Sequence, residues 1–127
     1  MKKIINTPNA PAPIGPYNQA VLSGNTLFIS GQIPIDPVSG ELVSGDIQKE
    51  TRQSMENLKA ILHEAGMSFE HVVKTSIFVK DMHQFNLINE AYALYFDADT
   101  APARETVEVA NLPKFVNVEI SMIAVKD

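Results

Sequence analysis

The stretch NVEISMIAV, residues 117–125, decides the fold most directly, because apolar and polar side chains alternate along it. Side chains on a β-strand point to opposite faces in turn, so alternate residues share a face. The wholly apolar face holds Val118, Ile120, Met122 and Ala124. The mixed face holds Glu119, Ser121, Ile123 and Val125. We therefore expect a strand whose first face is covered by other elements and whose second face is only partly in contact with water.

Hydrophobic periodicity upstream of this strand predicts a helix that could cover it. Asp46 is a good N-cap residue, and Gly66 stands where a left-handed C-terminal cap is expected. Between them, residues at intervals of three and four would form one face. These are Ile47, Thr51, Met55, Leu58, Ile61, Leu62 and Ala65.

A second helix is predicted to open at Asp81, where Gln84 follows three residues later in a capping-box pattern. Its buried stripe would contain Phe85, Ile88, Tyr92 and Phe96. With the first helix it would cover the apolar face of the sheet.

Five further segments, one loop and four strands, complete the predicted order. The proline-rich stretch 8–16 reads as a loop, and the runs 18–24 and 25–31 read as a hairpin around a Gly-Asn turn. In the hairpin, Phe28 and Ser30 lie on the mixed face if Leu27 and Ile29 face the helices. Residues 71–79 and 104–109 read as strands rich in β-branched residues.

The alternation of these two strands is less simple. In the strand 71–79, two alternative sets of apolar residues could face the core. One set is Val73, Ile77 and Val79, and the other is Val72 and Phe78. In the strand 104–109, we expect the helices to bury two valines, Val107 and Val109. Arg104, Thr106 and Glu108 would then lie on the mixed face.

The resulting order, β-β-α-β-α-β-β, predicts an α+β two-layer sandwich in which two helices cover one face of a mixed sheet. Residues 1–127 would form a single domain. The mixed face is too apolar to be left in water, so we expect a homo-oligomer with a ligand cleft at the interface between subunits.

Composition narrows the kinds of partner. The chain has 127 residues, a formal net charge of −5 and no cysteine. The acidic balance disfavours nucleic-acid and membrane partners, and the missing thiols exclude disulfides and cysteine-bound metals. His63, His71 and His83 lack metal-ligand spacing, so no metal site is expected. Without a signal peptide or an apolar run of about 18 residues, the chain is expected to be cytoplasmic.

Arg104 is the most informative charged residue. On its own, an arginine on a strand is usually solvated or paired, and Glu105 and Glu108 are local candidates for the pair. Its guanidinium could instead bind a ligand carboxylate through two parallel hydrogen bonds. Glu119 has a similar pair of interpretations: it could orient a water molecule for hydrolysis, or form a structural ion pair with Arg104.

Segments along nearly the whole chain resemble the Rid (YjgF-type) family, and within it the reactive-intermediate imine deaminases. These segments are APIGPYNQAV (12–21), LFISGQIPIDPVSGELV (27–43), DIQKETRQSMENLKAIL (46–62), FVKDM (78–82), FNLINEAYALYF (85–96), PARETVEVANLPK (102–114) and VNVEISMIAV (116–125). The resemblance implies a chorismate-mutase-like fold and a homotrimer with three ligand sites between subunits. The implied reaction is hydrolysis of 2-iminopropanoate and 2-iminobutanoate to 2-oxo acids and ammonia, without a cofactor.

The resemblance also implies roles for individual residues. Arg104 matches the arginine that binds the substrate carboxylate, and Glu119 matches the glutamate near the attacking water. Tyr17 matches a catalytic pocket residue. The remaining matches line the substrate pocket: Ser30, Gly31, Asn89 and Thr106.

Two positions depart from the family pattern, which commonly has Arg-x-Cys where this chain has Arg104-Glu105-Thr106. A threonine keeps the backbone groups that the family offers to its ligand, but it loses any role of a thiol. Glu105 stands where a small residue is more usual. We expect these departures to affect rate or substrate range rather than reaction type.

Two other functions compete with imine hydrolysis. One is a non-catalytic, carboxylate-binding or chaperone-like regulatory protein of the same fold. The other is the endoribonuclease or translation-inhibitor activity sometimes attached to the family, which the acidic charge disfavours.

Overall fold

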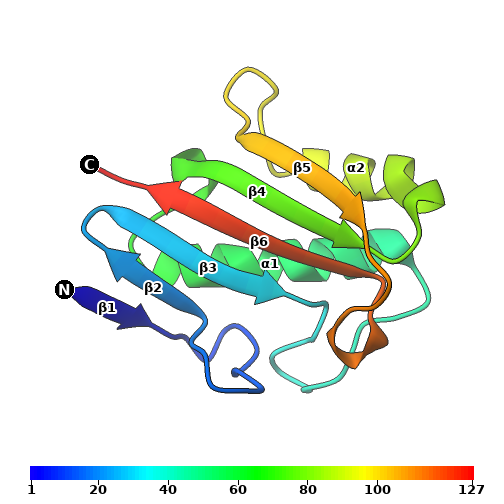
Figure 1. Cartoon of the computed structure of the whole chain (residues 1–127), viewed down its shortest axis with the longest axis horizontal. Coiled ribbons are helices and arrows are strands. Elements are labelled where there is room, and N and C mark those ends of the chain that lie inside the picture. The colour runs from blue at the N-terminus through cyan, green and yellow to red at the C-terminus, as the bar shows by residue number, and fades with distance from the viewer.

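The computed structural model describes all residues 1–127 and contains six strands and two α-helices (Figure 1). The elements in chain order are β1 (Lys2–Ile5), β2 (Ala20–Ser23), β3 (Thr26–Gln32), α1 (Ile47–Glu64), β4 (Val72–Val79), α2 (Phe85–Ala93), β5 (Ala103–Glu108) and β6 (Val118–Val125). Short 3-10 turns occur at η1 (Phe69–His71), η2 (Met82–Gln84) and η3 (Pro113–Phe115).

The strands form one sheet in the order β1-β2-β3-β6-β4-β5. The β4–β5 pair is parallel and the other pairs are antiparallel. Both helices lie behind the sheet in Figure 1, so one face is covered and the other is open. The predicted two-layer α+β fold is therefore confirmed, with one strand more than expected.

The additional strand, β1, pairs with β2 from Lys2↔Ser23 to Ile5↔Ala20 at the edge of the sheet. Two lysines followed by two isoleucines show no alternation, so the pattern alone gave no sign of a strand. Only Ile5 is buried.

The alternation of β6 is confirmed. Its helix-facing residues are almost completely buried, while those on the other face are half-buried. In β3, which the sequence pattern left open, Leu27 and Ile29 face the core, and Phe28 lies on the open face with 49% of its surface exposed.

A β-bulge resolves the ambiguous strand β4. The register against β6 shifts between Val72 and Lys74, so Val72 is buried and Val73 is exposed. Beyond the bulge, Thr75, Ile77 and Val79 face the core. A bulge inserts one extra residue, so the inward-facing positions before and after it are no longer separated by an even number of residues. Both halves of the strand can therefore bury side chains against the helices, although no single alternation describes the whole strand.

The helix ends follow the predicted signals only in part. Asp46 caps α1 by accepting hydrogen bonds from the backbone of Gln48 and Lys49, and Gly66 follows with a left-handed φ of 73°. The capping box predicted for the second helix is wrong. The Asp81 side chain caps the η2 turn, and α2 begins after that turn without a side-chain cap.

The loop before β2 is held by the buried side chain of Gln19. Its Nε2 donates to the carbonyls of Thr7, Ala10 and Pro11, and its Oε1 accepts from the Thr7 amide at 2.7 Å. This one amide satisfies four backbone groups in a segment that has no regular hydrogen bonding of its own. It thereby shapes the loop that carries Ile14 and Tyr17.

Gln19→Ala is expected to lower the free energy of unfolding by about 3 kcal/mol, since four hydrogen bonds are lost and buried backbone groups are left unpaired. Urea denaturation followed by circular dichroism measures this change. Asn18→Ala, which removes a half-buried neighbouring amide and its single solvent-exposed hydrogen bond from Asn6, is the control. An equal, small change in both variants would contradict the structural role of Gln19.

A second buried polar contact joins α1 to the start of β6. The Glu50 carboxyl group, 3% exposed, accepts a hydrogen bond of 3.0 Å from Asn117 Nδ2. Burial raises the pKa of Glu50 above its ordinary value of 4.5, although the Asn117 hydrogen bond acts in the opposite direction. A raised native pKa means that this group favours folding most at low pH and loses that contribution as the pH rises through the native pKa.

Glu50→Gln keeps the acceptor for Asn117 but cannot ionise, so we expect a higher free energy of unfolding than wild type at pH 7. The difference should close as the pH falls below about 4.5, where Glu50 is protonated in both states. Denaturation of the two proteins across this pH range tests the sign. A variant that is less stable at pH 7 would show that the charged form is favoured instead.

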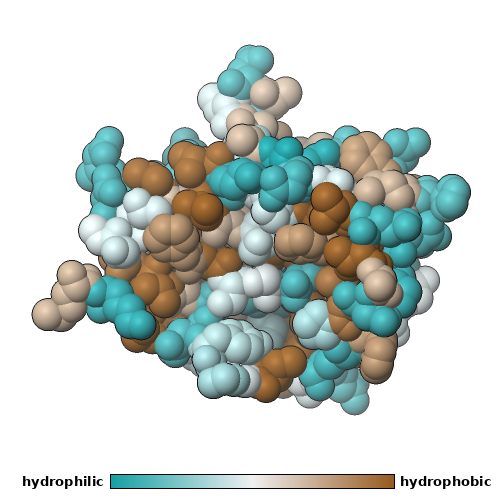
Figure 2. Space-filling view, in the orientation of Figure 1, coloured by the Kyte–Doolittle hydropathy of each residue, from teal (hydrophilic) through white to brown (hydrophobic).

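The open face of the sheet is a mixture of apolar and polar side chains, as Figure 2 shows. Phe28, Val73 and Val107 are among its exposed apolar residues. Lys74 and Glu105 form an ion pair of 2.9 Å on the same face. No helix is both long and apolar enough to cross a membrane.

Candidate functional site

Strand β5 presents Arg104 to the helices, contrary to expectation. Arg104 lies opposite Thr75 in the parallel register, and Thr75 is completely buried beneath α2. The predicted faces of β5 are therefore wrong. Val107 lies on the open face with 39% exposed, and Val109 packs beyond the end of the strand against a small separate cluster. The register of pairing with β4 determines which side chains of this edge strand face the helices. The two valines of β5 alone could not show which face that is.

The contacts of Arg104 define the first half of the candidate site. The Arg104 Nη1 donates a hydrogen bond of 2.8 Å to Asn89 Oδ1 on α2. The guanidinium carbon lies 5.0 Å from the ring centre of Tyr92 and 5.7 Å from that of Phe85. We call Arg104, Thr106, Asn89, Phe85 and Tyr92 the arginine half-site.

No carboxylate lies within 4.0 Å of Arg104. Glu105 instead pairs with Lys74 and accepts a hydrogen bond from Ser76, and Glu108 accepts one from the Met82 amide. The predicted alternatives of an ion pair with Glu105 or Glu108 are therefore wrong. Arg104 is a half-buried cation whose charge is not neutralised by the chain itself.

Thr106 follows on the same face of β5, opposite the buried Ile77. Its hydroxyl oxygen is buried and has no hydrogen-bond partner within the chain. Unpaired buried hydroxyls are uncommon because each costs about 1–3 kcal/mol. Its position beside Arg104 gives the arginine half-site a second polar group that is free to bind a ligand or water.

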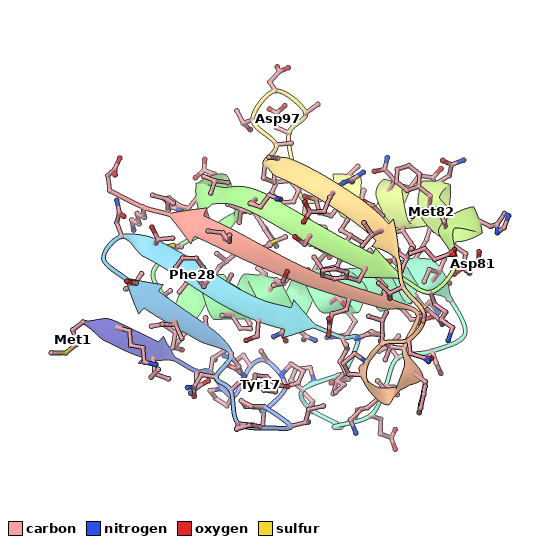
Figure 3. All side chains as sticks on the ribbon, in the orientation of Figure 1. Met1, Tyr17, Phe28, Asp81, Met82 and Asp97 are labelled. Atoms are coloured by element: carbon pink, nitrogen blue, oxygen red, sulfur yellow. The ribbon has the colours of Figure 1, made fainter.

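The second half of the candidate site is a hollow on the open face, with a volume of about 330 Å³. Its lining residues are Ile14, Tyr17, Ser30, Gly31, Pro113 and Glu119. We call this set the glutamate half-site. Tyr17, labelled in Figure 3, belongs to the loop before β2, and Glu119 projects from β6.

A second bulge positions Ser30 and Gly31 at this hollow. The register between β3 and β6 shifts between Ile29 and Gln32, so the intervening backbone departs from regular pairing. The Ser30 hydroxyl donates to the Asn18 carbonyl at 2.7 Å, and the Tyr17 hydroxyl accepts from the Ile14 amide at 3.2 Å. The Ser30 contact ties the end of this loop to the sheet beside Glu119, and the Tyr17 contact holds the loop together internally.

Gly31 is in close contact with Glu119. A Cβ atom at Gly31 would lie 2.7 Å from the carboxyl carbon of Glu119 and 2.9 Å from its Oε1. Any larger residue at this position must therefore displace the carboxyl group. Burial raises the pKa of Glu119, and no hydrogen bond or opposite charge offsets this effect.

The two half-sites lie on opposite faces of the sheet in one chain. Arg104 faces the helices and Glu119 faces the open side, and strand β4 lies between their strands. A direct Arg104–Glu119 ion pair within the chain, one of the sequence-based alternatives, is therefore wrong. Tyr17, Ser30 and Gly31 lie with Glu119, whereas Asn89 and Thr106 lie with Arg104.

Sequence reasoning did not identify four of the surrounding residues. Ile14 and Pro113 line the glutamate half-site, and Phe85 and Tyr92 contact Arg104. Phe85 and Tyr92 could be recognised only as part of a buried helical stripe. A larger hollow of about 420 Å³ lies along α1 and includes none of the predicted site residues.

The chain is similar in sequence to known proteins along nearly its whole length. Residues 7–126 match the sequence model of the family described as endoribonuclease L-PSP, the Rid or YjgF family. The chain belongs to the Rid family. A RutC family protein of Pyrococcus horikoshii is 56% identical over 127 residues, which is 100% of both chains.

Two further members of the Rid family are informative. The 2-iminobutanoate/2-iminopropanoate deaminase of Escherichia coli K12 is 49% identical over 128 aligned positions, covering 99% of each chain. The crystal structure of E. coli TdcF with bound serine superposes with a TM-score of 0.92 at 46% identity, covering 98% of this chain and 99% of that one. The predicted resemblance to the Rid family is thus confirmed, together with its fold.

Proposed function

We propose that this Rid family member hydrolyses 2-imino acids, with 2-iminopropanoate and 2-iminobutanoate as substrates, to 2-oxo acids and ammonia. The observation that carries the proposal is the half-buried Arg104, a cation with no carboxylate partner in its own chain. A relative named for this activity and another solved with a bound amino acid support the same substrate class.

Arg104 would bind the substrate carboxylate. The planar guanidinium can donate two parallel hydrogen bonds to the two carboxylate oxygens, which fixes both the position and the orientation of the substrate. Its Nη1 already donates to Asn89, so the other N–H groups are available for a ligand. The Thr106 hydroxyl and the nearby backbone could complete the polar contacts.

Glu119 would activate the attacking water. Because burial raises its pKa, its carboxylate is a stronger base than that of a free glutamate, which suits a group that must accept and return a proton near neutral pH. The Tyr17 hydroxyl, at the rim of the same hollow, would orient the water or the nitrogen.

The proposed reaction has two steps, the addition of water and the loss of ammonia. The water oxygen bonds to C2 of the protonated imine as the C=N π electrons move to nitrogen, and Glu119 accepts a water proton to leave a carbinolamine. Glu119 then returns this proton to the nitrogen. The C–N bond breaks with its electron pair going to nitrogen, the hydroxyl oxygen forms the C=O bond, and the hydroxyl proton passes to solvent water. The products are the 2-oxo acid and ammonia.

The proposed site requires more than one copy of the chain, since two faces of one sheet cannot converge on a small ligand. We propose a homotrimer, as the family resemblance implies, in which the arginine half-site of one subunit meets the glutamate half-site of its neighbour. The apolar residues of the open face, among them Phe28, Val73 and Val107, would be buried between subunits.

Pyruvate formation tests the proposal. Serine and a pyridoxal-phosphate-dependent dehydratase supply 2-aminoacrylate, which tautomerises to 2-iminopropanoate, and pyruvate is followed with and without this protein. We expect at least tenfold faster formation with the wild-type chain, as acid–base catalysis of this kind contributes about 100-fold or more. Arg104→Ala should return the rate to background.

The controls separate catalysis from binding. The folding and the oligomeric state of both proteins are checked first. A folded wild-type oligomer that accelerates neither this reaction nor the one from 2-aminocrotonate would contradict the deaminase proposal and favour the carboxylate-binding, regulatory alternative.

A further inference from the structure

The guanidinium of Arg104 is held entirely by neutral groups. The Tyr92 ring lies 5.0 Å away, the Phe85 ring 5.7 Å away, and the Asn89 amide oxygen accepts its one hydrogen bond within the chain, at 2.8 Å. A half-buried arginine commonly pairs with a carboxylate, but Asn89 offers only an amide. This arrangement holds the guanidinium in place without neutralising its positive charge.

Aromatic rings are suited to this task because their faces attract a cation through the ring quadrupole without carrying a net charge. A carboxylate in the same place would hold the guanidinium more firmly but would cancel its charge and occupy its donors. The environment therefore stabilises Arg104 while keeping it attractive to an incoming anion.

Tyr92 is the more firmly held of the two rings. Its side chain is 5% exposed, and its hydroxyl donates a hydrogen bond of 3.0 Å to the hydroxyl of Thr75, which is completely buried on β4. Burial raises the pKa of the Tyr92 phenol, so it stays neutral. The ring packs against Phe96 at 4.9 Å between centres, which limits its movement further.

We propose that Tyr92 is a positioning residue that, with Phe85 and Asn89, holds Arg104 as an un-neutralised cation and so makes the site selective for anionic ligands. This inference rests on the proposed function insofar as Arg104 receives the substrate carboxylate. The affinity for the substrate carboxylate would then depend on the Tyr92 ring and the Asn89 amide, which need not touch the substrate.

Binding of two matched ligands tests the inference. 2-Oxobutanoate, the product of the proposed reaction, carries the carboxylate, and 2-oxobutanamide is its uncharged counterpart. Isothermal titration calorimetry measures both with the oligomeric protein. Tyr92→Leu should weaken 2-oxobutanoate binding about 3- to 30-fold and leave the amide unchanged, since a cation–π contact of this kind is worth that range. Tyr92→Phe should stay within about twofold.

Asn89→Asp provides a second, independent arm. The new carboxylate would lie where the amide oxygen now contacts Arg104 and would neutralise it. We expect 2-oxobutanoate binding to weaken by about tenfold or more while thermal stability is unchanged or raised. A residue with a merely structural role would not show this combination of lost binding and retained stability.

Ile88→Ala is the matched structural control. Ile88 is buried on the same helix and forms neither a hydrogen bond nor a cation–π contact with Arg104, so this variant should lose stability without losing selectivity for the acid. Equal losses for acid and amide in Tyr92→Leu, or unchanged acid binding in Asn89→Asp, would overturn the inference. Wild-type protein that does not prefer 2-oxobutanoate over its amide would overturn the proposed function as well.

Discussion

Arg104→Ala and Glu119→Gln chains, each inactive by itself, are expected to become active when they assemble into the same oligomer. Arg104 and Glu119 lie on opposite faces of one sheet, so the proposed site takes one of them from each of two neighbouring chains. In an equal mixture, about a quarter of the interfaces would combine an intact arginine half-site with an intact glutamate half-site. Each variant alone should be about 100-fold or more below wild type.

The experiment is co-expression of the two variants with different affinity tags, followed by isolation of oligomers that carry both. Pyruvate formation from 2-aminoacrylate is then compared with that of each variant alone. The double variant mixed with either single variant is the control, because one class of intact half-site is then missing from every interface. Mixed oligomers as inactive as their parents would show that the site does not combine residues from two subunits.

Gly31→Ala is expected to abolish most activity while the fold remains intact. The added methyl group would lie under 3.0 Å from the Glu119 carboxyl carbon, Cγ and Oε1, so the carboxyl group must move. A displacement of about 1 Å at a reacting group can cost about 100-fold in rate. The displaced atoms are at the end of a flexible side chain, and Gly31 does not have a left-handed backbone, so stability should change by less than about 1 kcal/mol.

Steady-state kinetics and thermal denaturation of the same preparation separate these two effects. Gly15→Ala is the matched control, because its added methyl group would meet the Tyr17 ring at 3.4 Å, an ordinary contact distance. It should keep most of the activity. If Gly31→Ala has near-normal kcat and KM, the position of the Glu119 carboxyl group is not important for the reaction.

The covered face of the sheet could be predicted from sequence where a single strand shows a clear alternation of apolar and polar residues. The alternation in β6 identified the covered face, because a strand buried on one side must alternate. The capping residues Asp46 and Gly66 likewise marked the ends of α1 through local chemistry. Strand alternation and helix capping both depend on residues that are close together in the sequence.

The features that could not be predicted depend on partners far apart in the chain. The bulge at Val72–Lys74 and the face of Arg104 are set by register against other strands, which no local pattern records. The candidate site shows the same division. Its residues could be named from the family resemblance, but their separation into two half-sites follows from the register of β5 against β4, which turns Arg104 toward the helices.

If the proposed function holds, a chain that carries its two half-sites on opposite faces of the sheet is an incomplete catalyst on its own. Under the proposed assembly, the measured activity per chain depends on the affinity between subunits. The specific activity therefore falls when the protein is diluted below the dissociation constant of the oligomer. Substitutions on the open face, such as at Phe28 or Val73, would then reduce turnover without altering any group that contacts the substrate. The amount of protein in the cell would itself set the fraction of complete sites.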